Sequence, residues 1–178
     1  MFVDRLLCAQ DASGYTRPFL CSPTSTAQQP LAGLDAMEGE LSLVAWGKDG
    51  LLILKQTHAA QESLWRYTLP DGPAEKLAGC PEAAVWGGGF FGEGEELVVH
   101  MQDAATPPRF VAVDASTGAV GRTVLSAGDG RGGGGALPSG RPMVSVELEG
   151  GGNGETVQAW LATPEGDGPS APAHFSLI

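Results

Sequence analysis

The chain repeats a pattern of short apolar runs every 46 residues, and no other feature constrains its fold as strongly. The run Arg5–Gln10 matches Leu51–Gln56, 46 positions later, and a second step of 46 reaches Leu97–Gln102. Each run has the composition of a short strand and closes on a glutamine. Self-similarity at about 40–50 residues is typical of β-propeller blades, which are small antiparallel sheets of four strands.

The same spacing continues into the segments that follow each run. Two more sets keep it, namely 17–20 with 63–66 and 109–112, and Leu31–Gly33 with Leu77–Gly79 and, two residues further out, Leu125–Gly128. An opening strand is expected at Leu43–Trp46 in the second copy and at Ala83–Trp86 in the third, whereas the first copy has none. Three segments that keep one spacing argue against chance similarity.

Turn-forming residues separate the expected strands. Lys48-Asp49-Gly50, Pro70-Asp71-Gly72 and Ser116-Thr117-Gly118 have the composition of tight turns. A longer loop is expected after Trp86, at Gly87–Gly94. The one helix-like stretch, Leu31–Glu38, is short and interrupted by glycine.

These patterns predict an all-β chain in which residues 1–138 form an incomplete β-propeller of about three four-stranded blades. We expect Leu6, Ile53 and Val99 to occupy equivalent places in successive antiparallel sheets. The 27 glycines and 13 prolines suit many short strands joined by turns. An all-β sandwich with regularly spaced strands is the competing architecture.

The repeat stops after Asp129, and a second part of the chain begins. Residues 130–135 are five glycines and one arginine, which indicates a flexible linker. Two strands are then expected at Met143–Leu148 and Thr156–Leu161, joined by the glycine-rich turn 150–154. We assign residues 139–178 to a second domain, of which this hairpin forms the first strands.

Charge and hydropathy exclude some partners. Lys and Arg number 10 against 21 Asp and Glu, giving a net charge of −11, and such a field repels nucleic-acid phosphates. No apolar run is long enough to span a membrane, and the N-terminus does not resemble a signal peptide. Cys8, Cys21 and Cys80 have no CxxC or Cys/His spacing, so we expect three small buried side chains and a reducing, cytoplasmic location.

Motifs that would carry chemistry are either absent or better explained as structure. Gly128–Gly133 matches G-x-G-x-x-G, but a phosphate site needs a helix N-terminus next, and here Pro138 and more glycines follow. The aspartates fit solvated turns rather than a calcium loop, and the tryptophans of the expected strands fit packing between blades. These residues are Asp49, Asp71, Asp103, Asp114 and Asp129, and Trp46, Trp65 and Trp86.

Serine catalysis needs a nucleophile turn, a histidine base and an orienting carboxylate. The sequence has no G-x-S-x-G. His58 is expected in a loop between strands, and His100 is expected to be a partly buried histidine within a strand. His174 is close to the last residue of the sequence, Ile178. We therefore assign no catalytic, cofactor-binding or metal-binding residue in this chain, and no cofactor.

The second part of the chain contains Arg141-Pro142, a strand, a glycine turn and then Gln158–Pro169. This series resembles a junction in the prolyl oligopeptidase family of serine peptidases, and the similarity is to members akin to acylaminoacyl-peptidases. Residues 107–114, Thr117-Gly118 and Leu125 are similar to a last-blade sequence of that family. There, a β-propeller precedes an α/β-hydrolase domain that such a strand pair opens.

The resemblance implies a fragment of a serine-type peptidase, with the propeller gating peptide substrates. It stops beyond Pro169, where the family would continue to a His-Gly-Gly-Pro segment and a nucleophile serine. His174 has no glycines after it, so the family's histidine is not assigned to it. We therefore expect a truncated hydrolase domain without its triad, and we leave the chain's own enzymatic activity open. A stand-alone propeller-like module that binds another protein, without catalysis, is the alternative.

Overall fold

The structure, a computed structural model, is all-β. It describes residues 5–12, 14–25, 27–81, 83–92, 96–126, 143–149, 156–162 and 174–176. The chain divides into two compact units, one of residues 1–101 and 109–126 and one of residues 102–108 and 127–178. Each unit is considered by itself.

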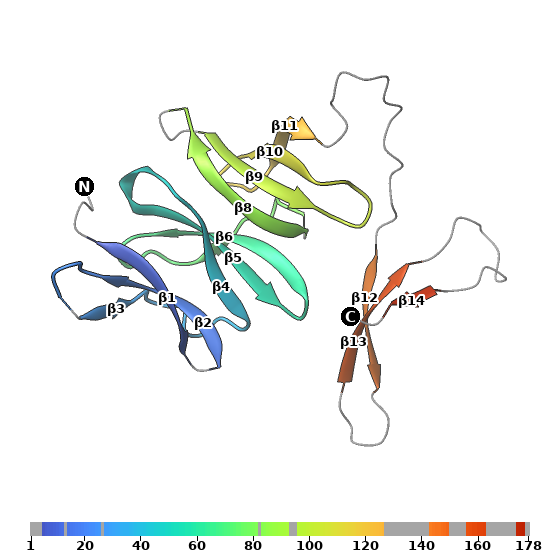
Figure 1. Cartoon of the computed structure of the whole chain (residues 1–178), viewed down its shortest axis with the longest axis horizontal. Helices are drawn as coiled ribbons and strands as arrows, with labels where there is room; N and C mark the ends of the chain where they lie inside the picture. Colours follow the sequence, from blue (N-terminus) through green and yellow to red (C-terminus); the bar gives the residue numbers. More distant parts are fainter. Residues whose placement is uncertain are drawn as a thin grey trace. The chain divides into compact units, whose positions relative to one another are not determined.

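In the described part of the first unit, consecutive strands form three antiparallel sheets (Figure 1). The first sheet has the order β1 (Leu6–Ala12), β2 (Tyr15–Cys21), β3 (Gln28–Pro30). The second has β4 (Glu40–Trp46), β5 (Leu51–His58), β6 (Gln61–Thr68), β7 (Glu75–Lys76). The third has β8 (Ala84–Phe91), β9 (Glu96–Gln102), β10 (Arg109–Val113), β11 (Val120–Ser126). This four-strand meander is the arrangement of a propeller blade.

The 46-residue repeat is visible in the hydrogen bonds as well as in the strands. Leu7 pairs with Leu20 across β1 and β2. The residues 46 positions later, Ile53 and Arg66, pair in the same way across β5 and β6. The turns after the third strands repeat in the same way. The Gly72 N–H donates to the Thr68 carbonyl oxygen at 2.8 Å, and the Gly118 N–H to the Asp114 carbonyl oxygen at 2.7 Å. The turns expected at 70–72 and 116–118 are confirmed.

The second sheet is covered on both faces, which is how neighbouring blades pack. One apolar cluster joins it to the first sheet and consists of Leu20, Leu31, Leu34, Leu41, Leu52, Leu54, Tyr67 and Leu69. The other joins it to the third sheet and includes Ile53, Leu64, Leu77, Val85, Leu97, Val99, Met101 and Val111. Side chains alternate along β5, so Leu52 and Leu54 face one neighbour and Ile53 the other. Each middle strand is therefore apolar on both sides.

The prediction that Ile53 and Val99 are equivalent is wrong. Both belong to the cluster between the second and third sheets, so Val99 faces back toward Ile53 instead of continuing in its direction. By the face it covers, Val99 corresponds to Leu54, 45 residues earlier, and not to Ile53. The slip of one residue in β9 turns every side chain of that strand to the other face.

The first copy also corrects the choice of Leu6. Leu6 is 52% exposed, while Leu7 packs against the cluster between the first and second sheets. Leu7 is thus the equivalent of Ile53. Leu6 corresponds to Leu52. No described sheet of the first unit covers the face of the first sheet on which Leu6 lies.

The loop predicted at Gly87–Gly94 is largely strand, because β8 runs through Phe91. The glycines of β8 allow neighbouring strands to approach its backbone closely. A Cβ atom on Gly88 would lie 2.7 Å from the Val98 carbonyl oxygen and 3.0 Å from Val44 Cγ1. Residues 31–38 form turns, as their glycine and short length suggested, and no α-helix occurs in the described part of the chain.

The second unit contains one antiparallel sheet of β12 (Val144–Glu149), β13 (Thr156–Ala162) and β14 (His174–Ser176), in that order. Val146 pairs with Ala159, which is fully buried. The two strands expected from residue 143 to 161 are confirmed. The predicted boundary at 138/139, the linker 130–135 and the turn 150–154 lie outside the described residues.

Candidate functional site

The third sheet presents a row of aromatic side chains on the face away from the second sheet. In β9 and β10, Val99 and Val111 point into the buried cluster, so His100 and Phe110, which pair across the strands, point the other way. The His100 and Phe110 rings stack with centroids 4.4 Å apart and planes 13° apart. The Trp86 ring of β8 lies 6.3 Å from the His100 ring. Trp86, His100 and Phe110 are called the aromatic row below.

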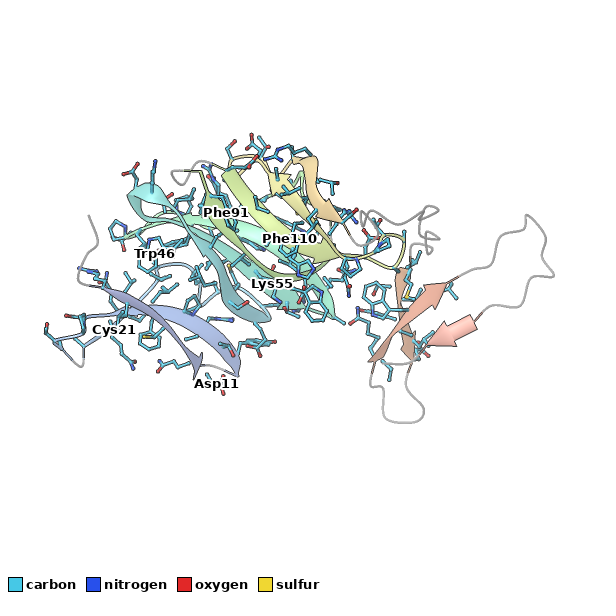
Figure 2. The ribbon with its side chains drawn as sticks, turned by 45° about the horizontal axis from the view of Figure 1, so that its top comes forward. Asp11, Cys21, Trp46, Lys55, Phe91 and Phe110 are labelled. Atoms are coloured by element: carbon cyan, nitrogen blue, oxygen red, sulfur yellow. The ribbon has the colours of Figure 1, made fainter. Side chains whose placement is uncertain are left out.

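The aromatic row is open to solvent. Trp86 is 68% exposed and Phe110 38%, and Leu125, which pairs with Phe110 from β11, is 55% exposed. Figure 2 shows Phe110 on the third sheet. Contiguous exposed apolar surface is characteristic of places where another protein segment, a ligand or a membrane packs. The prediction of a partly buried strand histidine at position 100 is confirmed. The prediction that Trp86 packs between blades is wrong for the described sheets, because its ring is mostly exposed.

The other two tryptophans are packed as predicted. Trp46 and Trp65 lie against the cluster between the first and second sheets. The Trp65 Nε1–H donates to Gln56 Oε1 at 2.9 Å, and Gln56 Nε2 donates to the Glu38 carbonyl oxygen at 2.8 Å. Gln56, one of the glutamines that close the repeated runs, therefore satisfies a polar group at the edge of the core.

A polar joint links the second and third sheets. Lys55 Nζ lies 2.8 Å from Glu62 Oε1 and donates to the Val85 carbonyl oxygen at 2.9 Å. The Glu62 carboxylate also accepts the Val85 backbone N–H. Both side chains are about one-fifth exposed. The pair therefore holds the start of β8.

The four described aspartates that were predicted in turns, Asp49, Asp71, Asp103 and Asp114, lie in or beside turns. Asp49 has φ 54° between β4 and β5, and the Asp103 carboxylate accepts the Ala105 N–H at 2.8 Å. Asp114 accepts the N–H groups of Ser116 and Thr117 and the Ser116 hydroxyl. These hydrogen bonds lower the pKa of Asp114 to about 2, and the bond from the Ser116 hydroxyl has the largest effect. Asp129 and residues 128–133 lie outside the described residues.

The described residues bring together no acid–base or metal constellation. His58, the last residue of β5, lies 3.3 Å from the Glu38 carboxylate, and both side chains are exposed. No group of three His, Cys, Asp or Glu side chains within the described ranges could hold a metal ion. Nor does that part of the chain contain a helix long and apolar enough to cross a membrane. The side chain of His174 lies outside what is described.

The prediction of three buried cysteines is wrong for Cys8 and Cys21, and the sequence did not predict that these two would meet. Cys8 Sγ and Cys21 Sγ lie 3.1 Å apart on the first sheet, and both residues are half-buried, whereas Cys80 is buried in the core. A cavity of about 190 Å³ lies beside Cys21, between the end of β2 and β3. Arg5, Ser22, Ala27, Gln28 and Gln29 complete its lining with Leu20.

Neither a protein-family model nor a curated protein sequence matches the chain. Its fold is similar to the crystal structure of TolB from Acinetobacter baumannii, with a TM-score of 0.52 and 12% identity over 89% of this chain. The chain spans 38% of the TolB chain, which contains a C-terminal β-propeller. The likeness concerns the fold alone. The all-β architecture of small antiparallel sheets is that of partial propeller blades.

Proposed function

We propose that the chain is part of a serine peptidase similar to the prolyl oligopeptidase family, in which its propeller blades restrict the peptides that reach the catalytic domain. The order of the two units carries the proposal. Repeated blade-like sheets come first, and the β12–β13 hairpin follows where that family joins its propeller to its α/β-hydrolase domain. The junction residues Arg141-Pro142 and Gln158–Pro169 supply the resemblance.

In this proposal residues 1–138 belong to the propeller and residues 139–178 to the start of the hydrolase domain. The reaction is peptide-bond hydrolysis through an acyl-enzyme, catalysed by a Ser-His-Asp triad. No residue of this chain is assigned to that triad. The partners are peptides, the location is cytoplasmic, and neither nucleic acid nor a membrane takes part. The net charge of −11 supports the exclusion of nucleic acid.

The test is to read the encoding DNA beyond the codon for Ile178 in all three frames and to express the extended protein. A His-Gly-Gly segment followed by G-x-S-x-G, together with labelling by a serine-directed fluorophosphonate, would support the proposal. The 178-residue chain is the matched control. If all three frames lack both motifs, the peptidase proposal fails.

A second function, a module that binds another protein without catalysis, is favoured by the exposed aromatic row. Its rings offer a wide apolar contact on a rigid sheet. Two measurements separate these functions. For a binding module, Phe110→Ser abolishes partner binding and no peptidase motif exists downstream, whereas in the peptidase the same surface is covered within one chain.

A further inference from the structure

The two half-buried thiols of the first sheet form a close pair. The register places Leu6 opposite Cys21 and Cys8 opposite Phe19. Cys8 and Cys21 are thus diagonal neighbours on one face, because side chains two residues apart in a strand point the same way. Their sulfur atoms lie 3.1 Å apart. Formation of a disulfide would bring the two sulfur atoms about 1 Å closer together.

Packing alone does not explain a thiol at both positions. The corresponding residues of the second sheet, 46 positions later, are Leu54 and Tyr67, and both are fully buried between the first and second sheets. In the first sheet two smaller, more exposed side chains take these places and contact each other. The second sheet therefore has large apolar groups at these positions, whereas the first sheet has two thiols in contact.

Small molecules can reach the pair. Cys8 and Cys21 are both half-buried, and the cavity beside Cys21 opens at the edge of the sheet. Figure 2 labels Cys21 at one end of the first sheet and Asp11 at the other. Cys80, the third cysteine, is 9% exposed and packs between the second and third sheets. It serves as an internal control that the same reagent reaches poorly.

We propose that Cys8 and Cys21 are a reversible oxidation site, converted to an intramolecular disulfide by a small-molecule disulfide such as oxidised glutathione. The Cys8 thiolate attacks one sulfur of the oxidant and releases one glutathione thiolate, which takes up a proton. Cys21 then loses its proton and attacks the Cys8 sulfur, and the second glutathione leaves. Two protein thiols are oxidised, and one glutathione disulfide is reduced to two thiols.

The hydrogen bond to Cys8 raises the pKa of the Cys21 thiol above its usual value, and the same disulfide forms whichever thiol attacks first. The product links β1 to β2, and β1 is an edge strand whose described partner is β2. Oxidation should slow opening of β1, because the link restrains the separated strands.

The test uses the whole 178-residue chain with oxidised glutathione, followed by acid quenching and thiol counting in denaturant. The three thiols should fall to one, with peptide mapping showing a Cys8–Cys21 link. Hydrogen exchange of residues 6–12 should slow by roughly tenfold or more. Dithiothreitol should restore both values.

Variants separate this site from general thiol reactivity. Cys80→Ser should still lose both remaining thiols, whereas Cys8→Ser and Cys21→Ser should each end as a mixed disulfide with glutathione at the surviving partner. If serine variants fail to fold, the peptide map of the unaltered chain decides alone. Glutathione attached to Cys8 and Cys21 without an internal link, a link to Cys80, or a link between two chains would overturn the proposal.

Discussion

The ammonium group of Lys55 lies 2.9 Å from the carbonyl oxygen of Val85, and this hydrogen bond joins the second sheet to the third. Glu62 completes the joint, because its carboxylate contacts Lys55 and also accepts the Val85 N–H. Both backbone groups of one residue in β8 are thus held by side chains from the neighbouring sheet. A pair of blades held in this way fixes its relative position through polar contacts as well as through apolar burial.

Removing this joint should destabilise the fold. We expect Lys55→Met to lower the free energy of unfolding by about 1–3 kcal/mol, because Glu62 and the Val85 carbonyl each lose a partner in a partly buried place. Urea unfolding followed by circular dichroism measures the change. The matched control is Arg66→Met, which breaks an exposed pair with Glu75 and should cost less than about 1 kcal/mol. Equal losses in the two variants would contradict the role of the joint.

Two adjacent glycines of β8 should respond differently to alanine. A methyl group on Gly88 meets the Val98 carbonyl oxygen and Val44, whereas one on Gly87 meets nothing within 4 Å. We expect Gly88→Ala to cost about 1–3 kcal/mol of stability, because the Val98 backbone of β9 and the Val44 side chain of the second sheet must both shift. Gly87→Ala should change stability by less than about 0.5 kcal/mol. Thermal unfolding of the two variants compares them directly, and an equal effect would exclude close packing at Gly88.

The Asp114 turn should contribute stability that depends on pH. Its pKa is about 2 in the folded chain, against an ordinary value of 3.8. The ionised carboxylate therefore stabilises the fold fully above about pH 4, and this contribution is lost as the pH falls toward 2. We expect the advantage of the native chain over Asp114→Asn, in urea midpoint, to be smaller at pH 3 than at pH 6.

Two variants at Asp114 separate charge from hydrogen bonding. Asn can still accept the Ser116 and Thr117 N–H groups, whereas Ala cannot. Asp114→Ala should therefore melt at a lower temperature than Asp114→Asn at every pH. A difference between the native chain and Asp114→Asn that stays constant from pH 6 to pH 3 would count against the depressed pKa.

The exposed aromatic row should promote self-association. We expect Trp86→Ser to reduce the apparent size of the chain at high concentration, measured by sedimentation velocity, with little effect on its unfolding, because Trp86 is mostly exposed. Trp65→Ser is the matched control. It removes a half-buried ring and its bond to Gln56, so it should lower stability. Self-association that persists unchanged in Trp86→Ser would show that a surface other than the aromatic row mediates it.

The sequence predicted the sheets well because each blade is local. Strands that follow one another along the chain also pair, so spacing and turn residues define the meander without any long-range information. The shift from Leu7 to Ile53 held for this reason. It failed at Val99, because the middle strands are apolar on both faces and their composition does not report a one-residue slip. Only the contact with Ile53 decides which way Val99 points.

Two other features depend on partners that spacing does not reveal. The glycines after Trp86 suggest a loop, and it is the backbone of Val98 and the side chain of Val44 that explain them within a strand. The approach of Cys8 to Cys21 depends on the register of β1 and β2, which sets Cys8 opposite Phe19. Two cysteines 13 residues apart match no known motif. Their contact could have been predicted only from the register of the hairpin formed by β1 and β2.

The last prediction concerns catalysis by the 178-residue chain. Acyl transfer by the family's mechanism needs a serine on a strained turn, with a histidine base about 3 Å away. The sequence contains no G-x-S-x-G, and the two described histidine side chains are engaged otherwise. His58 faces the Glu38 carboxylate, and His100 stacks on Phe110. We therefore expect no labelling by a serine-directed fluorophosphonate and no turnover of acylaminoacyl chromogenic substrates. Peptide binding by the blades cannot substitute, because only interactions made in the transition state lower the barrier. The extended protein should react in both assays. Stoichiometric labelling of one serine of the 178-residue chain, abolished by His100→Ala or His174→Ala, would show that a complete site exists within it.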